Sequence, residues 1–278
     1  MAHMIKKIFI GCLLVTAFPA CVFADVIFRA SATLKVSLHS EEQQVVQTAF
    51  DIFSRDYEKV FGGNVMKVGN AQMLIGTLGG NSIAEKIIDQ KLINDLNQHQ
   101  EGFVILVKED KLYILGSDNA GTAYGILELS RLMGVSPWEW WADVPVVKRK
   151  TFVLKEGYKL FSYPSVKYRG VFLNDEDWGL QPWAAKTFEP ETKDIGPKTY
   201  AKIFELLLRL RANLIWPAMH PSTKAFFHYP GNIQMAAKYG IYIGSSHAEP
   251  MLRNNVDEWN EKTMGRFNYI TNKTQMNK

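Results

Sequence analysis

The chain has 278 residues, of which 47% are hydrophobic, enough to bury one large core or two modest ones. Its formal net charge is +4, and the lysines and arginines are spread along the sequence without a long basic block. The charge pattern therefore excludes nucleic acid as the expected partner.

Residues 1–24 have the pattern of a secretory signal peptide. Two lysines precede an apolar run at residues 8–18, and Val22-Phe23-Ala24 offers small and branched residues at the cleavage position. The run is too short to be a membrane span. We expect cleavage after Ala24 and export to the periplasm or the medium.

Both cysteines, Cys12 and Cys21, fall within this leader. A mature chain without them has no disulfide and no thiol chemistry, so its stability must come from its core. Lipoprotein anchoring at Cys21 is the less favoured alternative, because Phe18-Pro19-Ala20 matches the usual aliphatic lipobox poorly.

Residues 25–157 predict an N-terminal domain of mixed α/β type. Apolar periodicity and glycine stops define its elements, and Ser40 with Gln43 is expected to form a capping box at the first helix. The glycine-rich pieces lack a dinucleotide or P-loop pattern, so no cofactor is indicated. We expect strands at 26–36, 73–76, 102–107 and 112–116, and helices at 40–61, from 82, and at 122–132.

Three tryptophans, Trp138, Trp140 and Trp141, lie in the segment that joins this domain to the next. One interpretation is that they pack the two domains together. The other is that one of them stacks on a sugar ring, since aromatic faces pair with the apolar faces of pyranoses.

Residues 158–278 change to a repeated strand–helix pattern. The predicted strands at 171–173, 214–216 and 241–244 start 43 and 27 residues apart, against roughly 30 residues per unit in an eight-stranded barrel. Helices are expected at 197–213, 232–239 and 256–270. The fold class is therefore α/β, with the start of a (β/α)8 TIM barrel that is incomplete in this chain, or alternatively an open sheet.

Polar and aromatic groups follow each of these strands. Asn174 and Asp175 follow the first strand, Trp216 ends the second, and His247 and Glu249 follow the third. Parallel strands present such groups at one edge, where carboxylates handle protons and hydroxyls and an indole stacks on sugar. Each residue also has a purely structural interpretation: a loop acid, a core aromatic residue, or a polar side chain that is hydrogen-bonded within the fold.

Other interpretations of the same residues are weaker. Glu176 and Asp177 are expected to be loop acids that pair with Arg169 or Lys167. A metal site made of Asp175, His247 and Glu249 is conceivable, but their spacing matches no compact motif, so no metal is expected.

Three stretches carry a resemblance to a known family: Tyr168-Arg169-Gly170-Val171-Phe172-Leu173-Asn174-Asp175-Glu176-Asp177-Trp178, Arg211-Ala212-Asn213-Leu214-Ile215-Trp216-Pro217-Ala218-Met219 and Gly244-Ser245-Ser246-His247-Ala248-Glu249-Pro250-Met251. They resemble the N-terminal portion of the xylan α-1,2-glucuronidases of glycoside hydrolase family 115. The resemblance implies inverting removal of (4-O-methyl)glucuronic acid from glucuronoxylan or aldouronic acid oligosaccharides by an exported enzyme.

The resemblance also implies site roles. Asn174, Asp175, Trp216 and His247 match pocket residues of the family, with Asp175 as the catalytic candidate, while Glu249 is inferred from its place after the third strand. An inverting enzyme needs two carboxyl groups, and the family's proposed general acid lies on a later strand that this chain does not contain. We therefore expect an inactive fragment of a longer enzyme.

Two further classes of function remain open at this point. The chain is alternatively a non-catalytic carbohydrate-binding module, or part of a metal-dependent hydrolase. A homodimer of the full-length parent is also left open.

Overall fold

The computed structural model describes residues 24–80, 83–174, 176–246 and 258–278. Residues 1–23, which carry the expected signal peptide up to its last residue, lie outside the described part, as does Ser82, the expected start of the second helix. Asp175, His247 and Glu249 lie outside it as well.

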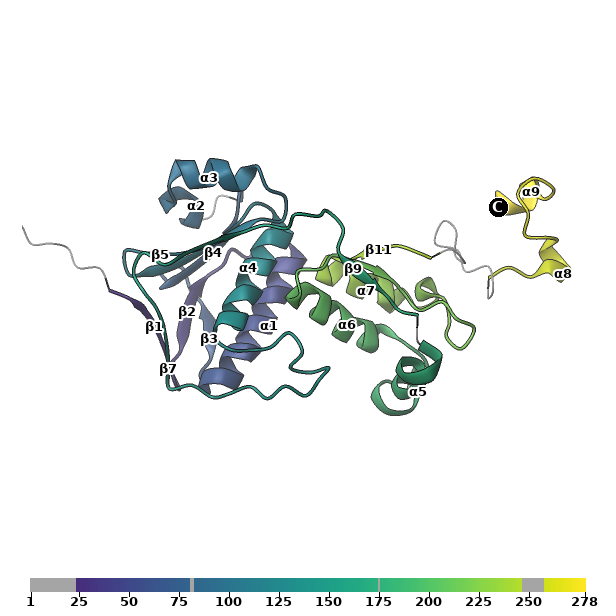
Figure 1. Cartoon of the computed structure of the whole chain (residues 1–278), viewed down its shortest axis with the longest axis horizontal. Helices are drawn as coiled ribbons and strands as arrows, with labels where there is room; N and C mark the ends of the chain where they lie inside the picture. The colour runs from purple at the N-terminus through teal and green to yellow at the C-terminus, as the bar shows by residue number, and fades with distance from the viewer. Residues whose placement is uncertain (1–23, 81–82, 175, 247–257) are drawn as a thin grey trace, which may run out of the picture.

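The first unit is built on a six-stranded sheet in the order β3-β2-β4-β6-β5-β8 (Figure 1). The first four strands of this order are parallel, and β5 runs antiparallel to both β6 and β8. The strands expected at 102–107 and 112–116 are confirmed as β5 and β6, which form a hairpin with Glu109 and Asp110 at its turn. The strands span Leu34–Ser37 (β2), Val65–Lys67 (β3), Met73–Thr77 (β4), Phe103–Lys108 (β5), Lys111–Gly116 (β6) and Lys159–Ser162 (β8).

Helices cover both faces of this sheet. α1 (Gln44–Phe61) and α4 (Asn119–Leu132) pack on one face, and α2 (Ile83–Ile87) and α3 (Gln90–Asn97) lie on the other. The alternation along β4 explains the two layers: Met73 and Ile75 belong to the larger core cluster, whereas Leu74 belongs to the cluster beneath α2 and α3.

Several expectations in this unit are wrong in detail. The strand expected at 26–36 is two strands: β1 (Val26–Arg29) pairs with β7 (Thr151–Leu154), and a turn with Ser31 at φ 59° separates it from β2. β7 and β8 were not anticipated. Ser40 does not cap α1, which begins after Gln43 with no side-chain cap. α4 begins at Asn119, because the Asp118 carboxylate accepts a hydrogen bond from the Gly121 amide at 2.8 Å.

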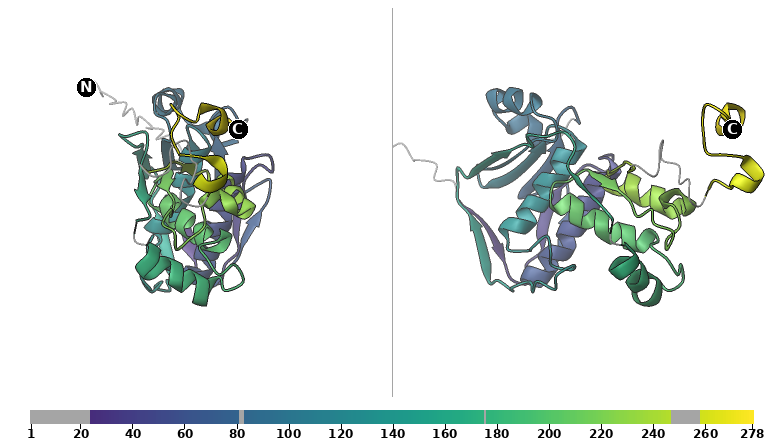
Figure 2. Two further views of the ribbon diagram at one scale, coloured as in Figure 1. Left: turned by 90° about the vertical axis from the view of Figure 1, so that its right-hand side faces the viewer. Right: turned by 45° about the vertical axis from the view of Figure 1, so that its right-hand side comes forward.

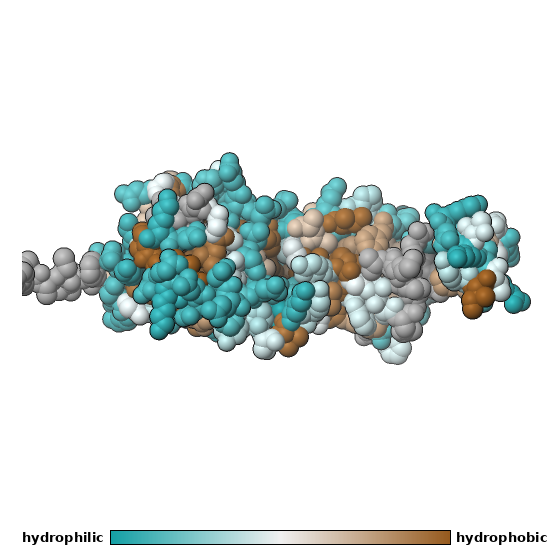
Figure 3. All heavy atoms as spheres, turned by 90° about the horizontal axis from the view of Figure 1, so that it is seen from above, coloured by the Kyte–Doolittle hydropathy of each residue, from teal (hydrophilic) through white to brown (hydrophobic). Residues whose placement is uncertain are grey.

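The second unit is a three-stranded parallel sheet in the order β11-β10-β9. Its strands are β9 (Gly170–Phe172), β10 (Leu214–Trp216) and β11 (Tyr242–Ile243), and α6 (Pro197–Arg209) and α7 (Pro230–Tyr239) connect them. The two helices cover one face, on which Ile215 is fully buried (Figure 2). Trp216 and Tyr242 remain 40% and 59% exposed. Apolar side chains gather over this sheet when it is seen from above (Figure 3).

A helical segment that the sequence pattern did not reveal follows β9. It runs through Glu176–Leu180 (η1, π-helical), Gln181–Trp183 (α5) and Ala184–Phe188 (η2, π-helical). Conversely, the helix expected at 256–270 is wrong over its described part. Only Glu261–Met264 (α8) is helical there, because Gly265 at φ 77° ends it, and Lys273–Met276 (α9) follows. A short 3-10 turn, η3 (Phe226–His228), precedes α7.

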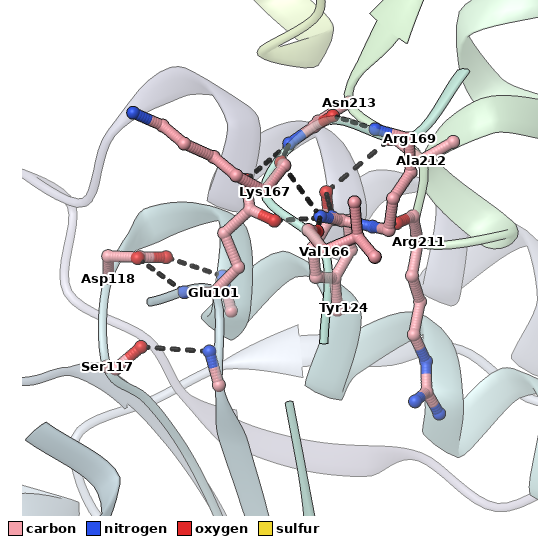
Figure 4. Close-up of polar contacts among 12 residues, drawn as sticks. Glu101, Ser117, Asp118, Tyr124, Val166, Lys167, Arg169, Arg211, Ala212 and Asn213 are labelled. Atoms are coloured by element: carbon pink, nitrogen blue, oxygen red, sulfur yellow. Dashed lines mark hydrogen bonds and ion pairs between the residues drawn. The ribbon is translucent and has the colours of Figure 1, made fainter. Parts of the chain in front are cut away.

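The two units share a polar network at their junction (Figure 4). Asn213 accepts a hydrogen bond from the Arg169 amide at 3.0 Å and donates one to Glu101 Oε1 at 2.8 Å. The Arg169 guanidinium forms an ion pair with Glu101. Arg169 is therefore committed to the first unit and not to the acidic residues after β9.

Two buried carboxylates at the same junction predict acid sensitivity. Burial alone would raise the pKa of Glu128 and of Glu205, yet arginines on both sides hold each pKa below the ordinary value of 4.5. Groups with depressed pKa values stabilise the fold above their unfolded pKa and lose that contribution as pH falls through the folded value.

We therefore expect the free energy of unfolding to be level near neutral pH and to fall once the pH drops below 4.5. Urea unfolding at a series of pH values measures this. Glu128→Gln should lower stability at neutral pH by about 1–3 kcal/mol and flatten the decline. An unchanged slope in that variant would contradict the assignment.

Candidate functional site

The carboxyl ends of β9, β10 and β11 define the candidate site. The Leu173 amide donates to the Trp216 carbonyl at 3.0 Å, so the pairing of β9 with β10 continues to the residue before Asn174. Asn174 is exposed and follows directly. The structure thus brings Asn174 and Trp216 to the same edge of the sheet, as the spacing predicts for parallel strands.

Trp216 spans this edge. Its indole meets the Phe172 ring of β9 edge-on, with centroids 5.6 Å apart and an interplanar angle of 66°. On the other side, a Cβ added to Gly244, just beyond β11, would lie 2.5 Å from the indole Nε1. The indole therefore lies over all three strand ends, and Gly244 leaves the room for it.

This packing makes Gly244 a determinant of the indole's position. Gly244→Ala should displace the Trp216 ring and cost about 1–3 kcal/mol of stability through overpacking. The displacement is measured as a shift of the Trp216 indole N–H resonance. Gly69→Ala is the matched control, because a Cβ there meets nothing within 4 Å. An unmoved Trp216 resonance would show that the ring is held by other contacts.

The Asp177 carboxylate contacts Nδ1 of the His220 imidazole and so joins the segments that follow β9 and β10. Their side chains are 29% and 63% exposed. Asp177 Oδ1 is buried and has no hydrogen-bond partner among the described residues. The expectation that Asp177 is a loop acid bound to Arg169 or Lys167 is wrong, because it lies in the helical segment and contacts His220.

The segment after β11 is tied to the same edge. Ser246 is 8% exposed, and its hydroxyl donates to the Met219 sulfur at 2.7 Å. His247 and Glu249, the binding residues expected here, lie outside the described part. Asp175, the expected catalytic residue, lies outside it too. Their roles therefore remain predictions.

The described groups form an amide, an indole and a carboxylate–imidazole pair around one sheet edge. Such a set can orient hydroxyl groups, stack on a pyranose and place a titratable cation beside an anion. No group of three histidine, cysteine or acidic residues within the described ranges could hold a metal ion. The trio Asp175, His247 and Glu249 lies outside those ranges.

Two features of this region escaped the sequence analysis. The contact between Asp177 and His220 joins residues with no shared local pattern. Two tryptophans of the inter-domain segment, Trp140 and Trp141, line one open hollow with Trp183 beside the helical segment. The run of tryptophans is visible in the sequence, but nothing in the sequence indicates that Trp183 in α5 packs against it. No helix in the ranges that the structure describes is long and apolar enough to cross a membrane.

Comparison with solved structures first defines the class of fold. The chain is similar to CpGH84D (10% identity, TM-score 0.52), covering 80% of this chain and 35% of that one. It is similarly related to a mutant β-hexosaminidase of Streptomyces plicatus (10% identity, TM-score 0.51), covering 80% of this chain and 43% of that chain. At this identity the likeness concerns the fold alone, which recurs in these carbohydrate-active enzymes. No curated protein sequence matches the chain.

The family follows from two further matches. The profile of glycosyl hydrolase family 115 matches residues 162–278. The solved structure of BtGH115A, described as a family GH115 4-O-methyl-α-glucuronidase with specificity for decorated arabinogalactans, is 44% identical with a TM-score of 0.85. The match covers 91% of this chain and 34% of that chain, so the present chain spans about a third of its relative's length. The chain belongs to glycosyl hydrolase family 115.

Proposed function

We propose that the chain is part of an exported glycoside hydrolase that removes (4-O-methyl)glucuronic acid α-1,2-linked to xylan, with inversion. The observation that carries this proposal is the set of Asn174, Trp216 and the Asp177–His220 pair at one sheet edge, in a chain 44% identical to a 4-O-methyl-α-glucuronidase. Neutral amide and indole groups suit a sugar ring, and an imidazole suits its carboxylate.

The roles of the individual residues follow from their positions. Asp175 is the catalytic carboxylate, adjacent to exposed Asn174. Asn174 and Trp216 hold the sugar, and His247 and Glu249 bind it from the third strand. His220, held by Asp177, follows β10 and offers an imidazole that can hydrogen-bond a uronate carboxylate.

The incomplete TIM barrel is part of the same proposal. Three parallel strands with helices on one face, and exposed Trp216 and Tyr242 on the other, fit the first units of a (β/α)8 barrel. Inversion requires a second carboxyl group across the sugar, which we place outside this chain. The 278-residue chain alone is therefore expected to be inactive.

The experiment compares this chain with the longer protein that contains it. Each is incubated with glucuronoxylan, and the released uronic acid is measured, with its initial anomeric configuration determined by proton NMR. Release of the β-anomer by the longer protein alone supports the proposal. Release by the 278-residue chain, or release of the α-anomer, contradicts it.

One observation favours a second substrate. BtGH115A is specific for decorated arabinogalactans. Arabinogalactan that bears 4-O-methylglucuronate is therefore the second candidate substrate. Running both polysaccharides in parallel decides between them. The alternative of a non-catalytic module predicts saturable binding of aldouronic acids by both proteins, with release of uronic acid by neither.

A further inference from the structure

An open hollow lies between the inter-domain segment and the helical segment that follows β9. It encloses about 670 Å³ and is lined by Trp140, Trp141 and Trp183 together with Glu139, Asp143, Gly179 and Leu180. The loop from α4 to β7 and the α5 region approach each other here (Figures 1 and 2). The hollow therefore adjoins the segment that starts at the candidate site.

The three indoles form one interlocked cluster. Trp140 meets Trp141 edge-on at 4.8 Å between centroids, and both lie within 6 Å of Trp183, at 5.8 and 5.9 Å. Aromatic rings in such arrangements hold one another in place. The rings that line the hollow are therefore not free to turn.

Contacts outside the hollow fix these rings further. Phe188 stacks on Trp183 at 4.9 Å with an angle of 10°. Lys202 lies over Trp140 at 4.9 Å, and its carbonyl accepts the Trp141 indole N–H at 3.1 Å. Neither Phe188 nor Lys202 lines the hollow. The indole surfaces are thus preorganised, which reduces the entropic cost of binding a rigid ring.

The charges of the hollow select among sugars. Glu139 is paired with Lys59 at 2.6 Å and is largely shielded. Asp143 is exposed, and it can accept hydrogen bonds from sugar hydroxyls. Because Glu139 is paired, the exposed carboxylate of Asp143 is the charge that an anionic uronate would meet, and the lining offers no basic side chain to bind it. The chemistry therefore fits a neutral pyranose and not the glucuronate that the candidate site would take.

We infer that the hollow lined by Trp140, Trp141 and Trp183 is a binding subsite for neutral main-chain sugars of the polysaccharide. This inference rests on the proposed function for its substrate class, a uronate-bearing polysaccharide. The subsite lies on the helical segment that leads away from Asn174. A polysaccharide chain held there would present its side-group uronate to the neighbouring edge of the sheet.

The test is titration of the chain with neutral oligosaccharides, xylohexaose in one arm and a linear galactohexaose in the other. Binding is followed by calorimetry and indole N–H resonances. We expect saturable binding in one arm, which identifies the main chain as xylan or galactan. Because neither probe carries a uronate, failure of the glucuronidase assay leaves this result unaffected, and the reverse also holds.

Three variants assign the binding to the hollow. Trp183→Ala should weaken it about tenfold or more, as for loss of an aromatic anchor. Gly179→Leu should weaken it equally without removing an indole, because a Cβ at Gly179 meets nothing within 4 Å and the added side chain fills the hollow. Trp178→Ala is the matched control: Trp178 is 87% exposed and does not line the hollow.

The outcomes are decisive. If Trp183→Ala fails to fold, as circular dichroism would show, Gly179→Leu alone decides. Absence of saturable binding of either hexaose by the folded chain overturns the inference. Binding that survives Gly179→Leu also overturns it, and so does equal weakening by Trp178→Ala.

Discussion

Asp56→Asn is expected to lower the free energy of unfolding by about 3 kcal/mol, because it removes one of the two carboxylates that pair with the buried Arg209 guanidinium and leaves Glu205 as the other. Asp56 on α1 and Arg209 on α6 are joined by two parallel hydrogen bonds of 2.8 and 2.9 Å. Their side chains are 1% and 6% exposed. Although burial opposes the charge, Asp56 and Glu205 raise the pKa of Arg209 above its ordinary value. Because an arginine does not lose its proton in proteins, the guanidinium stays charged in the variant as well.

Chemical denaturation of two control variants measures how much of the lost unfolding free energy is due to the Asp56–Arg209 pair. Arg55→Gln is the first control, because Arg55 also contacts Glu205 across the junction but is 51% exposed, so its loss should cost no more than about 1 kcal/mol. The double variant Asp56→Leu with Arg209→Leu should recover much of the loss, since it leaves no unpaired buried charge. Equal stability of Asp56→Asn and the parent would show that Glu205 alone compensates the guanidinium and would contradict the prediction.

The Asp56–Arg209 pair also shows where prediction from sequence stops. Helical spacing correctly places Phe50, Phe53 and Tyr57 of α1 in the core. The same spacing puts Asp56 beside them, but its partner lies 153 residues away. Nothing local in the sequence of either helix indicates the other, because the contact depends on how the two units dock.

Local chemistry explains which elements could be predicted. The β5–β6 hairpin and the glycine end of α7 are specified by adjacent residues, and both are confirmed. β7 and β8 escaped because each pairs with a strand far away in sequence and neither has a regular alternation. The segment after β9 escaped because its π-helical turns break the 3.6-residue period.

For the candidate site, the strand pattern predicted which residues meet but not how they are held. Asn174 and Trp216 lie at one edge because parallel strands end together. The placement of the Trp216 ring depends on Phe172 and on the missing side chain of Gly244, and the position of Asp177 depends on His220. These are tertiary contacts, which residue spacing does not encode.

Replacing Asp175 and Asp177 by asparagine, one at a time, should distinguish a catalytic residue from a positioning residue. In the longer glucuronidase that we propose contains this chain, Asp175→Asn is expected to lower kcat by about 10²–10⁴-fold, the usual contribution of a general base or acid. The melting temperature should remain unchanged. Steady-state kinetics with an aldouronic acid measure kcat and KM, and a loss of less than tenfold would remove Asp175 from the catalytic role.

Asp177→Asn should behave differently, because Asp177 acts through His220. An asparagine keeps a hydrogen-bond acceptor beside the imidazole but not the negative charge, so it holds the His220 ring less firmly. Binding of the anionic uronate then weakens in the ground state and the transition state alike, so KM rises by about tenfold while kcat changes little. A fall in kcat with unchanged KM would instead make Asp177 part of the chemistry, and would return the catalytic assignment to the whole acidic run after β9.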